Sequence, residues 1–360
     1  MKEELFEFLK AMKQPSSLEE CKQPKVILGQ EAFGRLFWKI KENQEKIPEI
    51  LSVISHELSQ MDRLRACCSA YFCGSMIEEV GVSNCGEVMV EFYCDLIKSC
   101  YEFLEFSSKQ EDEEIEDLTE DQITEQTLEK AFLEMPDAVR SYYGCNFITL
   151  AIMDIITRDH SSRRLLRQKN CYEMLETVKD FIPNVDYITQ VYCACMKLPL
   201  LVLAPKEKRG FLAEVNDVTN CFHLLTFLEA ELYKSGLAKE YQLKEYQFNE
   251  EIYQWATGEK MPFCGRTVNA HSQYYNYQVL NKTGNINTLV SDLIWGEMCP
   301  EAIPQFHGIA TIIMDSETAF AGRSWGSEFV FCCHEGLNPY FHIERELTLE
   351  EVQEKLSWDQ

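Results

Sequence analysis

The sequence lacks any apolar run long enough to cross a membrane. A membrane-spanning helix needs about 20 mainly apolar residues, and the most apolar helical stretch, 147–156, is interrupted by Thr149 and Asp154. The N-terminal stretch MKEELFEFLKAMK carries acids within its apolar part and has no small-residue cleavage site, so we expect no secretory signal. We therefore predict a cytoplasmic protein that does not associate with membranes.

Basic residues are scarce relative to acidic ones. The chain has 34 Lys and Arg against 59 Asp and Glu, which gives a formal net charge of −25. Neutralisation of phosphates by Lys and Arg supplies most of the affinity of a protein for nucleic acid. The sequence therefore argues against a nucleic-acid partner, and the acidic charge fits either a basic protein as the partner or simple solubility.

The sequence motifs of several large enzyme classes are also missing. We find no P-loop, no dinucleotide-binding fingerprint, no HExxH and no GxSxG sequence. These absences weaken an enzymatic interpretation without excluding one, and we expect no cofactor.

Sixteen cysteines are present, but they are scattered through apolar helix faces and do not form a short disulfide framework. Free thiols in a reducing compartment are the expected state. Cys67, Cys68, Cys193 and Cys195 lie in helical patterns without the two close pairs typical of structural zinc, so we predict core packing and no metal site.

Apolar residues recur at helical spacing from the N-terminus to about residue 197, with no strand pattern among them. Pro48 suits the first turn of a helix, Gly81 a helix end, and Ser83 or Asn84 the next N-cap. The stretch 138–156 is apolar around most of its circumference, which predicts a central helix. We predict a mainly α fold in which 1–197 form a curved antiparallel stack like HEAT or armadillo repeats.

The period changes after residue 197. Residues 198–203 and 211–215 read as the two strands of a hairpin, and Asn220 reads as the N-cap of a helix whose Glu229 and Glu231 face solvent. Further strands are expected at 309–314, 329–331 and 340–345, and a capping box of Thr348 and Glu351 predicts a helix through Leu356. Residues 198–360 therefore form a smaller α+β region.

An acidic loop is expected at residues 108–127. Ten acids and no base lie between 111 and 129, beginning with Glu111, Asp112, Glu113 and Glu114. Such a run is more often a solvated loop than a docking site, but these four acids are the candidate contacts for a basic partner.

Tyr274, Tyr275 and Tyr277 in HSQYYNYQVL form a second candidate binding surface. They could stack on a ligand ring, or they could form an aromatic seam of the core, and the seam is favoured because no basic residue lies near them.

A third candidate is a group of Cys and His residues near the C-terminus, Cys332, His334, His342 and His307. If Phe331 and Cys333 point inward on a strand, Cys332 and His334 point to its other face, where a thiol and an imidazole could react together. Because no third partner follows at a recognisable spacing, structural histidines are the favoured interpretation.

Ten residues form a recognisable pattern in the last quarter of the chain: Trp295, Glu297, Pro300, Ile303, Pro304, Gly308, Ser324, Trp325, Glu344 and Arg345. With this pattern the segment resembles the tail of uncharacterised bacterial proteins. The resemblance implies a helical N-terminal part and a small mixed C-terminal module, and it assigns no site.

The leading functional hypothesis is a non-enzymatic module that binds another, basic protein, for example as an immunity or inhibitor protein. The acidic helical surface would steer the partner, and an aromatic centre would supply affinity. The alternative is a small-molecule or hydrolytic enzyme with a site at the C-terminal Cys and His residues. The sequence predicts no oligomeric state.

Overall fold

The structure is a computed structural model. Contacts between residues divide it into two compact units, Met1–Tyr192 and Cys193–Gln360, and each is described by itself. The change of hydrophobic period places the boundary at residue 197. The described residues are 2–82, 84–241, 243, 249–261, 269–272, 276–279, 293–315 and 324–357.

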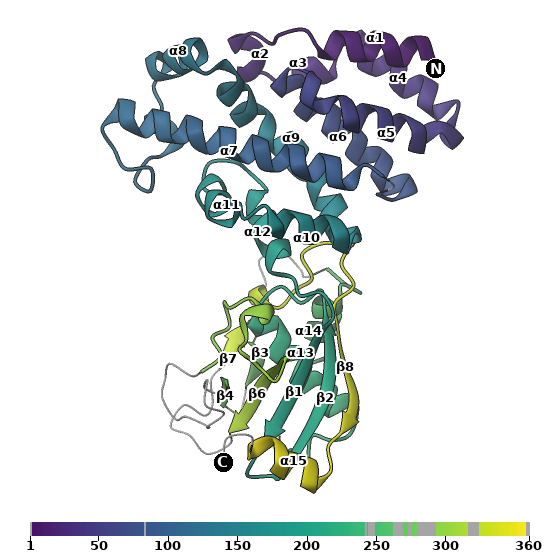
Figure 1. Ribbon diagram of the computed structural model, residues 1–360, viewed down its shortest axis with the longest axis vertical. Helices are drawn as coiled ribbons and strands as arrows, with labels where there is room; N and C mark the ends of the chain where they lie inside the picture. The colour runs from purple at the N-terminus through teal and green to yellow at the C-terminus, as the bar shows by residue number, and fades with distance from the viewer. Residues whose placement is uncertain are drawn as a thin grey trace. The chain divides into compact units, whose positions relative to one another are not determined.

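The first unit is built from helices (Figure 1). Of its three longest helices, α9 lies alongside both α6 and α7. The α-helices are α1 (Lys2–Met12), α2 (Leu18–Lys22), α3 (Lys25–Leu28), α4 (Glu31–Lys41), α5 (Ile47–Glu57), α6 (Arg63–Val80), α7 (Gly86–Glu111), α8 (Glu125–Glu134), α9 (Pro136–Arg158), α10 (His160–Gln168), α11 (Tyr172–Val178) and α12 (Val185–Cys193). Short 3-10 helices are η1 (Gln44–Lys46), η2 (Leu58–Gln60) and η3 (Glu120–Gln122).

Helix α9 is central, as predicted, because it contacts α2, α6, α7, α8 and α10. It approaches α6 closely through small residues. A Cβ atom added at Gly74 would lie 3.0 Å from the Cβ of Ala151, and one added at Gly144 would lie 2.8 Å from the Sγ of Cys67. Larger side chains at the two glycines would push the helices apart.

The N-terminal helices are fastened to this centre by a buried carboxylate, Asp62. Its oxygens accept hydrogen bonds from the backbone N–H (3.0 Å) and the hydroxyl (2.6 Å) of Ser16, between α1 and α2. Arg140 of α9 pairs with Asp62 at 3.1 Å and donates to the carbonyl of Ser16 at 2.8 Å. Arg65 of α6 reaches Glu20 of α2 at 2.7 Å. These contacts hold α2 and the segment between α1 and α2 against α6 and α9.

Several helix boundaries agree with the sequence and one does not. Pro48 lies in the first turn of α5, and Gly81 ends α6 with a φ of 82°. The N-cap of α7 is Cys85, not Asn84, and no side chain caps this helix; Ser83 lies outside the described residues. Mainly helical content is confirmed. A repeating stack stays a prediction, because the helices range from four residues in α3 to 26 in α7.

The second unit contains a six-stranded mixed sheet in the order β4-β6-β1-β2-β8, with β5 paired to β6 (Figure 1). β1 runs parallel to β6 and antiparallel to β2. A separate ribbon pairs β3 with β7. The elements are β1 (Leu198–Ala204), β2 (Arg209–Asn216), α13 (Cys221–Lys234), α14 (Glu250–Thr257), β3 (Asn269–Ser272), β4 (Asn276–Val279), η5 (Pro300–Ala302), β5 (Gln305–Phe306), β6 (Ile309–Asp315), β7 (Ser324–Gly326), η6 (Ser327–Phe329), β8 (Tyr340–Glu346) and α15 (Leu349–Leu356).

Most of the predicted elements of this unit are confirmed. The hairpin, the strands at 309–314 and 340–345, the Asn220 cap and the terminal capping box are all present. The strand expected at 329–331 is wrong. Ser327–Phe329 is a 3-10 turn closed by the bond from the Val330 N–H to the Ser327 carbonyl (3.2 Å), so the short apolar run that begins at Phe329 follows a turn and does not form a strand.

Glu229 of α13 was expected to face solvent, and this expectation is wrong. The side chain is fully buried, and one of its oxygens accepts a hydrogen bond from the hydroxyl of Tyr277 on β4. One helical turn earlier, Thr226 accepts a hydrogen bond from the indole of Trp325 at 2.9 Å. Two polar residues of α13 therefore face hydrogen-bond partners on β4 and β7. Helical spacing alone could not reveal these partners.

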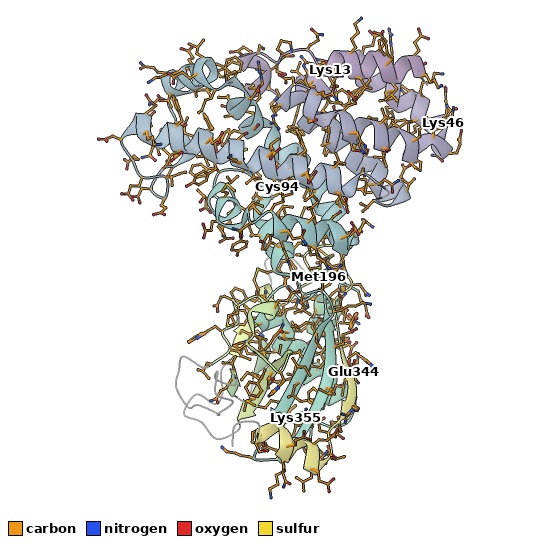
Figure 2. The ribbon with its side chains drawn as sticks, viewed as in Figure 1. Lys13, Lys46, Cys94, Met196, Glu344 and Lys355 are labelled. Carbon is orange, nitrogen blue, oxygen red and sulfur yellow. A yellow bond between two sulfur atoms is a disulfide. The ribbon has the colours of Figure 1, made fainter. Side chains whose placement is uncertain are left out.

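The expectation that all cysteines are free thiols is wrong for one pair. Cys193, the first residue of the second unit, forms a disulfide with Cys299 of the same unit, which lies 106 residues away in sequence and so gave no motif. Other described cysteines, such as Cys67, Cys73 and Cys221, are free thiols. Among them, Cys94 on α7 (Figure 2) has its Sγ atom 3.9 Å from that of Cys171. Burial raises the pKa of the Cys67, Cys73 and Cys221 thiols, as expected for core residues.

Among the helices of the described residues, we find none with the length and apolar character needed to cross a membrane.

Candidate functional site

The acidic loop is held to the fold by the first of its acids. Glu111, the last residue of α7, accepts hydrogen bonds from the hydroxyls of Thr127 (2.6 Å) and Thr124 (3.0 Å) at the start of α8. These bonds hold the pKa of Glu111 below its ordinary value. Leu118 is buried and anchors the middle of the loop. Glu111 therefore closes the loop and is not a free contact for a partner.

The next three acids surround the end of α7. Asp112 adopts a left-handed conformation, with a φ of 56°, at the C-cap of the helix. Asp112, Glu113 and Glu114 are exposed, and the backbone N–H of Glu113 donates to the Ser108 carbonyl at 3.0 Å. The loop thus presents carboxylates to solvent, but no exposed aromatic residue is among residues 108–127.

The tyrosine candidates are divided by the limits of the described residues. Tyr274 and Tyr275 lie outside them. Tyr277 is fully buried and directs its hydroxyl to Glu229. The buried position of Tyr277 therefore favours a role in the core over stacking on a ligand ring.

Cys332 and His334 are in contact, but the thiol meets the backbone carbonyl of His334 and not its imidazole ring. The thiol of Cys332 donates to the carbonyl of His334 at 3.1 Å, while the His334 Nδ1 accepts from the Gly336 N–H at 2.9 Å. Cys332 is buried against the end of α14, where its N–H donates to the Trp255 carbonyl at 2.9 Å, and Cys333 is half-buried, which reverses the orientation expected from a strand. Burial raises the pKa of the Cys332 thiol, which disfavours the reactive thiolate.

The other two histidines of this group have separate surroundings. His307 and Gly308 form the two-residue turn between β5 and β6, with positive φ angles of 49° and 80°. His342 is exposed on β8, where it faces Glu231 of α13; burial raises the pKa of Glu231, and the charges of Lys234 and His342 oppose this shift. Within the described ranges, no three His, Cys, Asp or Glu residues gather closely enough to hold a metal ion.

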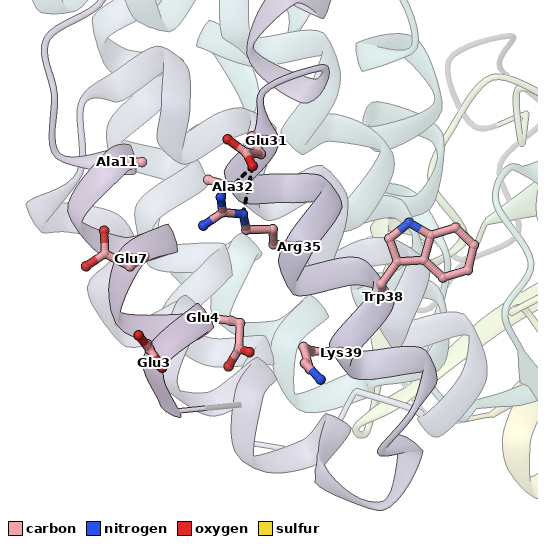
Figure 3. A pocket seen from close by; sticks show the side chains of 9 residues that line it. All are labelled: Glu3, Glu4, Glu7, Ala11, Glu31, Ala32, Arg35, Trp38 and Lys39. Carbon is pink, nitrogen blue, oxygen red and sulfur yellow. Dashed lines mark hydrogen bonds and ion pairs between the residues drawn. The ribbon is translucent and has the colours of Figure 1, made fainter.

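Sequence reasoning missed a hollow between α1 and α4 (Figure 3). We call it the α1/α4 groove, and its volume is about 610 Å³. The helices run in opposite directions along it, so that Glu3 and Glu4 lie near Lys39 while Ala11 lies near Glu31. Its lining residues are Glu3, Glu4, Glu7, Ala11, Glu31, Ala32, Arg35, Trp38 and Lys39.

The two walls of the groove carry different charge. In the α4 wall, the Nε of Arg35 donates to Glu31 at 2.9 Å, and Lys39 pairs with Glu42 at 2.9 Å, which raises the pKa of Lys39. Both cations of the lining therefore already have acidic partners. The charged residues of the α1 wall are all acids, and among the described residues neither Glu3 nor Glu7 makes an ion pair.

Two aromatic residues stand beside the groove on α4. The side chain of Trp38 is 67% exposed at the groove edge and points away from α1 (Figure 3). Phe37 is 40% exposed, contacts Trp38 edge to face at 5.6 Å, and lines a second hollow of about 260 Å³ with Leu28, Phe33 and Tyr71 among its walls. Helix α4 thus contributes residues to two hollows, the α1/α4 groove with its acidic lining and the smaller apolar hollow.

The sequence contains a signal for this site. The buried residues of α4 are Phe33, Leu36 and Ile40, which form one stripe at helical spacing. Trp38 falls outside that stripe, so it is a large apolar residue on the polar face of an amphipathic helix. Comparison with protein-family models, curated proteins and solved structures finds no match.

Proposed function

We propose that this protein is a non-enzymatic interaction module that binds a basic protein through the α1/α4 groove. The observation that carries the proposal is Trp38, an exposed indole at the edge of a hollow whose lining has four carboxylates and two cations. Tryptophan is enriched among the residues that dominate binding energy at protein interfaces, and its burial by a partner would supply affinity.

The charge of the chain supplies the second part of the proposal. A net charge of −25 attracts a basic partner over long range and speeds association at low ionic strength. An immunity or inhibitor protein acting on a basic toxin would use this chemistry. The charge by itself does not distinguish that role from binding of other basic proteins.

Affinity capture from a host lysate tests the proposal, with the bound proteins identified at low and at high salt. We expect a basic protein that is retained at low salt, elutes as salt rises, and is lost with Trp38→Ala. At 0.1 M salt the attraction between exposed charges is largely screened beyond about 10 Å, and this distance shortens as salt rises, which is why salt should release the partner.

Matched variants make the capture specific to the groove. Leu133→Ala removes an apolar side chain of α8 that is 84% exposed and does not line the groove. The double variant Glu3→Gln with Glu7→Gln removes two charges from the groove. The double variant Glu113→Gln with Glu114→Gln removes two charges from the acidic loop and is its control. Capture that is unaffected by Trp38→Ala and by the groove acids, and is lost with the loop acids, would contradict the groove as the site.

A further inference from the structure

We propose that the segment bound in the α1/α4 groove is a basic amphipathic α-helix of the partner, with two Lys or Arg residues one helical turn apart. This inference rests on the proposed function and specifies the partner's shape. It follows from the spacing of the wall residues, from the distribution of paired and unpaired charge, and from the backbone chemistry of the two helices.

The walls have the shape that a third helix requires. The α1 wall is the row Glu3, Glu7 and Ala11, and the α4 wall is the row Glu31, Arg35 and Lys39. In both rows the residues are four apart, and rows of this spacing form the ridges between which a neighbouring helix packs. Each of the two helices has 11 residues, so the groove is about 16 Å long at 1.5 Å per residue.

Two alanines line one end of the groove. Ala11 and Ala32 contribute only methyl groups, so they leave space between the helices at one end. At the other end Trp38 lies at the edge of the groove with its ring directed away from α1, so it would meet the partner outside the space between the two helices.

The unpaired charge fixes the chemistry of the occupant. Glu3 and Glu7 are one turn apart on α1, whereas the charges of the α4 wall are already matched by Glu31 and Glu42. Two cations at positions i and i+4 of a bound helix would lie on one face about 6 Å apart, which matches the spacing of Glu3 and Glu7. The complementary ligand therefore has its two bases on one face.

An extended peptide does not fit as well. The backbone N–H and C=O groups within α1 and α4 bond inside their own helices, so they offer no edge to which a strand could add. A helix satisfies its own backbone groups and needs only side-chain contacts. A second copy of this chain is disfavoured because its net charge of −25 opposes self-association.

The test uses synthetic peptides and the full chain. One alanine-based peptide of about 16 residues has Arg at i and i+4 with Leu at i−3 and i+7, so that all four share a face. Its isomer has the same composition with Arg at i and i+2, and a third peptide carries a central Pro that prevents a helix. Binding is measured by fluorescence anisotropy of the labelled peptide.

We expect the i, i+4 peptide to bind about threefold more tightly than its isomer, which loses one ion pair, and about tenfold more tightly than the Pro peptide, which loses both ion pairs and the apolar face. Glu3→Gln with Glu7→Gln should abolish this preference, and Glu113→Gln with Glu114→Gln should keep it. Charge reversal, Glu3→Lys with Glu7→Lys, should bind a peptide with Glu at i and i+4 in place of Arg.

Equal binding of the three peptides, or a preference that persists in Glu3→Gln with Glu7→Gln, would overturn the helical partner. The proposed function would stand in that case if the protein captured from lysate is still lost with Trp38→Ala. If that capture is independent of both Trp38 and the groove acids, the proposed function fails whatever the peptides show.

Discussion

The α1/α4 groove and the acidic loop are both rich in exposed carboxylates, but they use them differently. In the loop, Glu111 accepts hydrogen bonds from Thr124 and Thr127, and the acids that follow it lie around the end of α7. In the groove, Glu3 and Glu7 line one wall of a hollow beside an exposed indole. Acidic composition is thus shared by a structural turn and a candidate site, and only shape and aromatic neighbours separate them.

The largest expected effect is a loss of unfolding free energy when Asp62, which holds the segment beside α1, is removed. Asp62→Ala leaves Arg140 without its buried partner, and breaking a buried ion pair costs about 3 kcal/mol of unfolding free energy. Chemical denaturation measures this loss. Binding of the i, i+4 peptide should fall as well, because Asp62 fixes the segment between α1 and α2.

Asp137→Ala is the control for that variant. Asp137 also pairs with Arg140, at 3.0 Å, but its side chain is 69% exposed. Its loss should change the free energy of unfolding by less than about 1 kcal/mol. Similar losses of unfolding free energy in the two variants would contradict a special role for the buried contacts of Asp62.

A smaller effect is expected when the anchor of the acidic loop is removed. Leu118→Ala deletes a buried side chain and should cost about 2 kcal/mol of unfolding free energy. Hydrogen exchange should become faster in residues 112–122, while peptide binding in the groove is unchanged. Weaker peptide binding in this variant would mean that loop and groove are coupled.

The pH dependence of the loop follows from Glu111. Its pKa in the folded protein is below 4.5, so the carboxylate stabilises the loop above that pH, and the stabilisation is lost as pH falls through the folded pKa. The amide chemical shifts of Thr124 and Thr127 should titrate with a midpoint below 4.5. Glu111→Gln should remove this titration, and a midpoint at or above 4.5 in the unaltered chain would contradict the role of Glu111.

The smallest stability effect is expected in the groove itself. Glu7→Gln alters an exposed side chain without an ion pair among the described residues, so the free energy of unfolding should change by less than about 0.5 kcal/mol. Binding of the i, i+4 peptide should weaken about threefold, in keeping with the loss of one exposed ion pair. A large loss of stability would identify Glu7 as structural, like Glu111.

Much of the local structure could be predicted because it depends on neighbouring residues. Pro48, Gly81, Asn220 and the Thr348–Glu351 box act within one helical turn, and each occurs where the sequence indicates. The 329–331 segment failed because a short apolar stretch is compatible with a strand or with a buried turn.

The candidate site was harder to predict than the fold. Acidic runs and Cys or His clusters attract notice in a sequence, whereas the groove combines residues of α1 with residues of α4 about 28 positions away. Trp38 was visible as an apolar residue outside the buried stripe of its helix. Its meaning depends on the hollow beside it, which no spacing rule describes.

The sequence by itself determined the helical first unit, the hairpin and strands of the second, and the strong acidic charge, because period, caps and composition are local properties. The tertiary structure alone decided that Glu229 is buried against Tyr277, that Cys193 bonds with Cys299, and that Glu3 and Glu7 face a groove beside Trp38. Each of these joins residues distant in the chain, and which distant residues meet is decided by the packing of the whole unit.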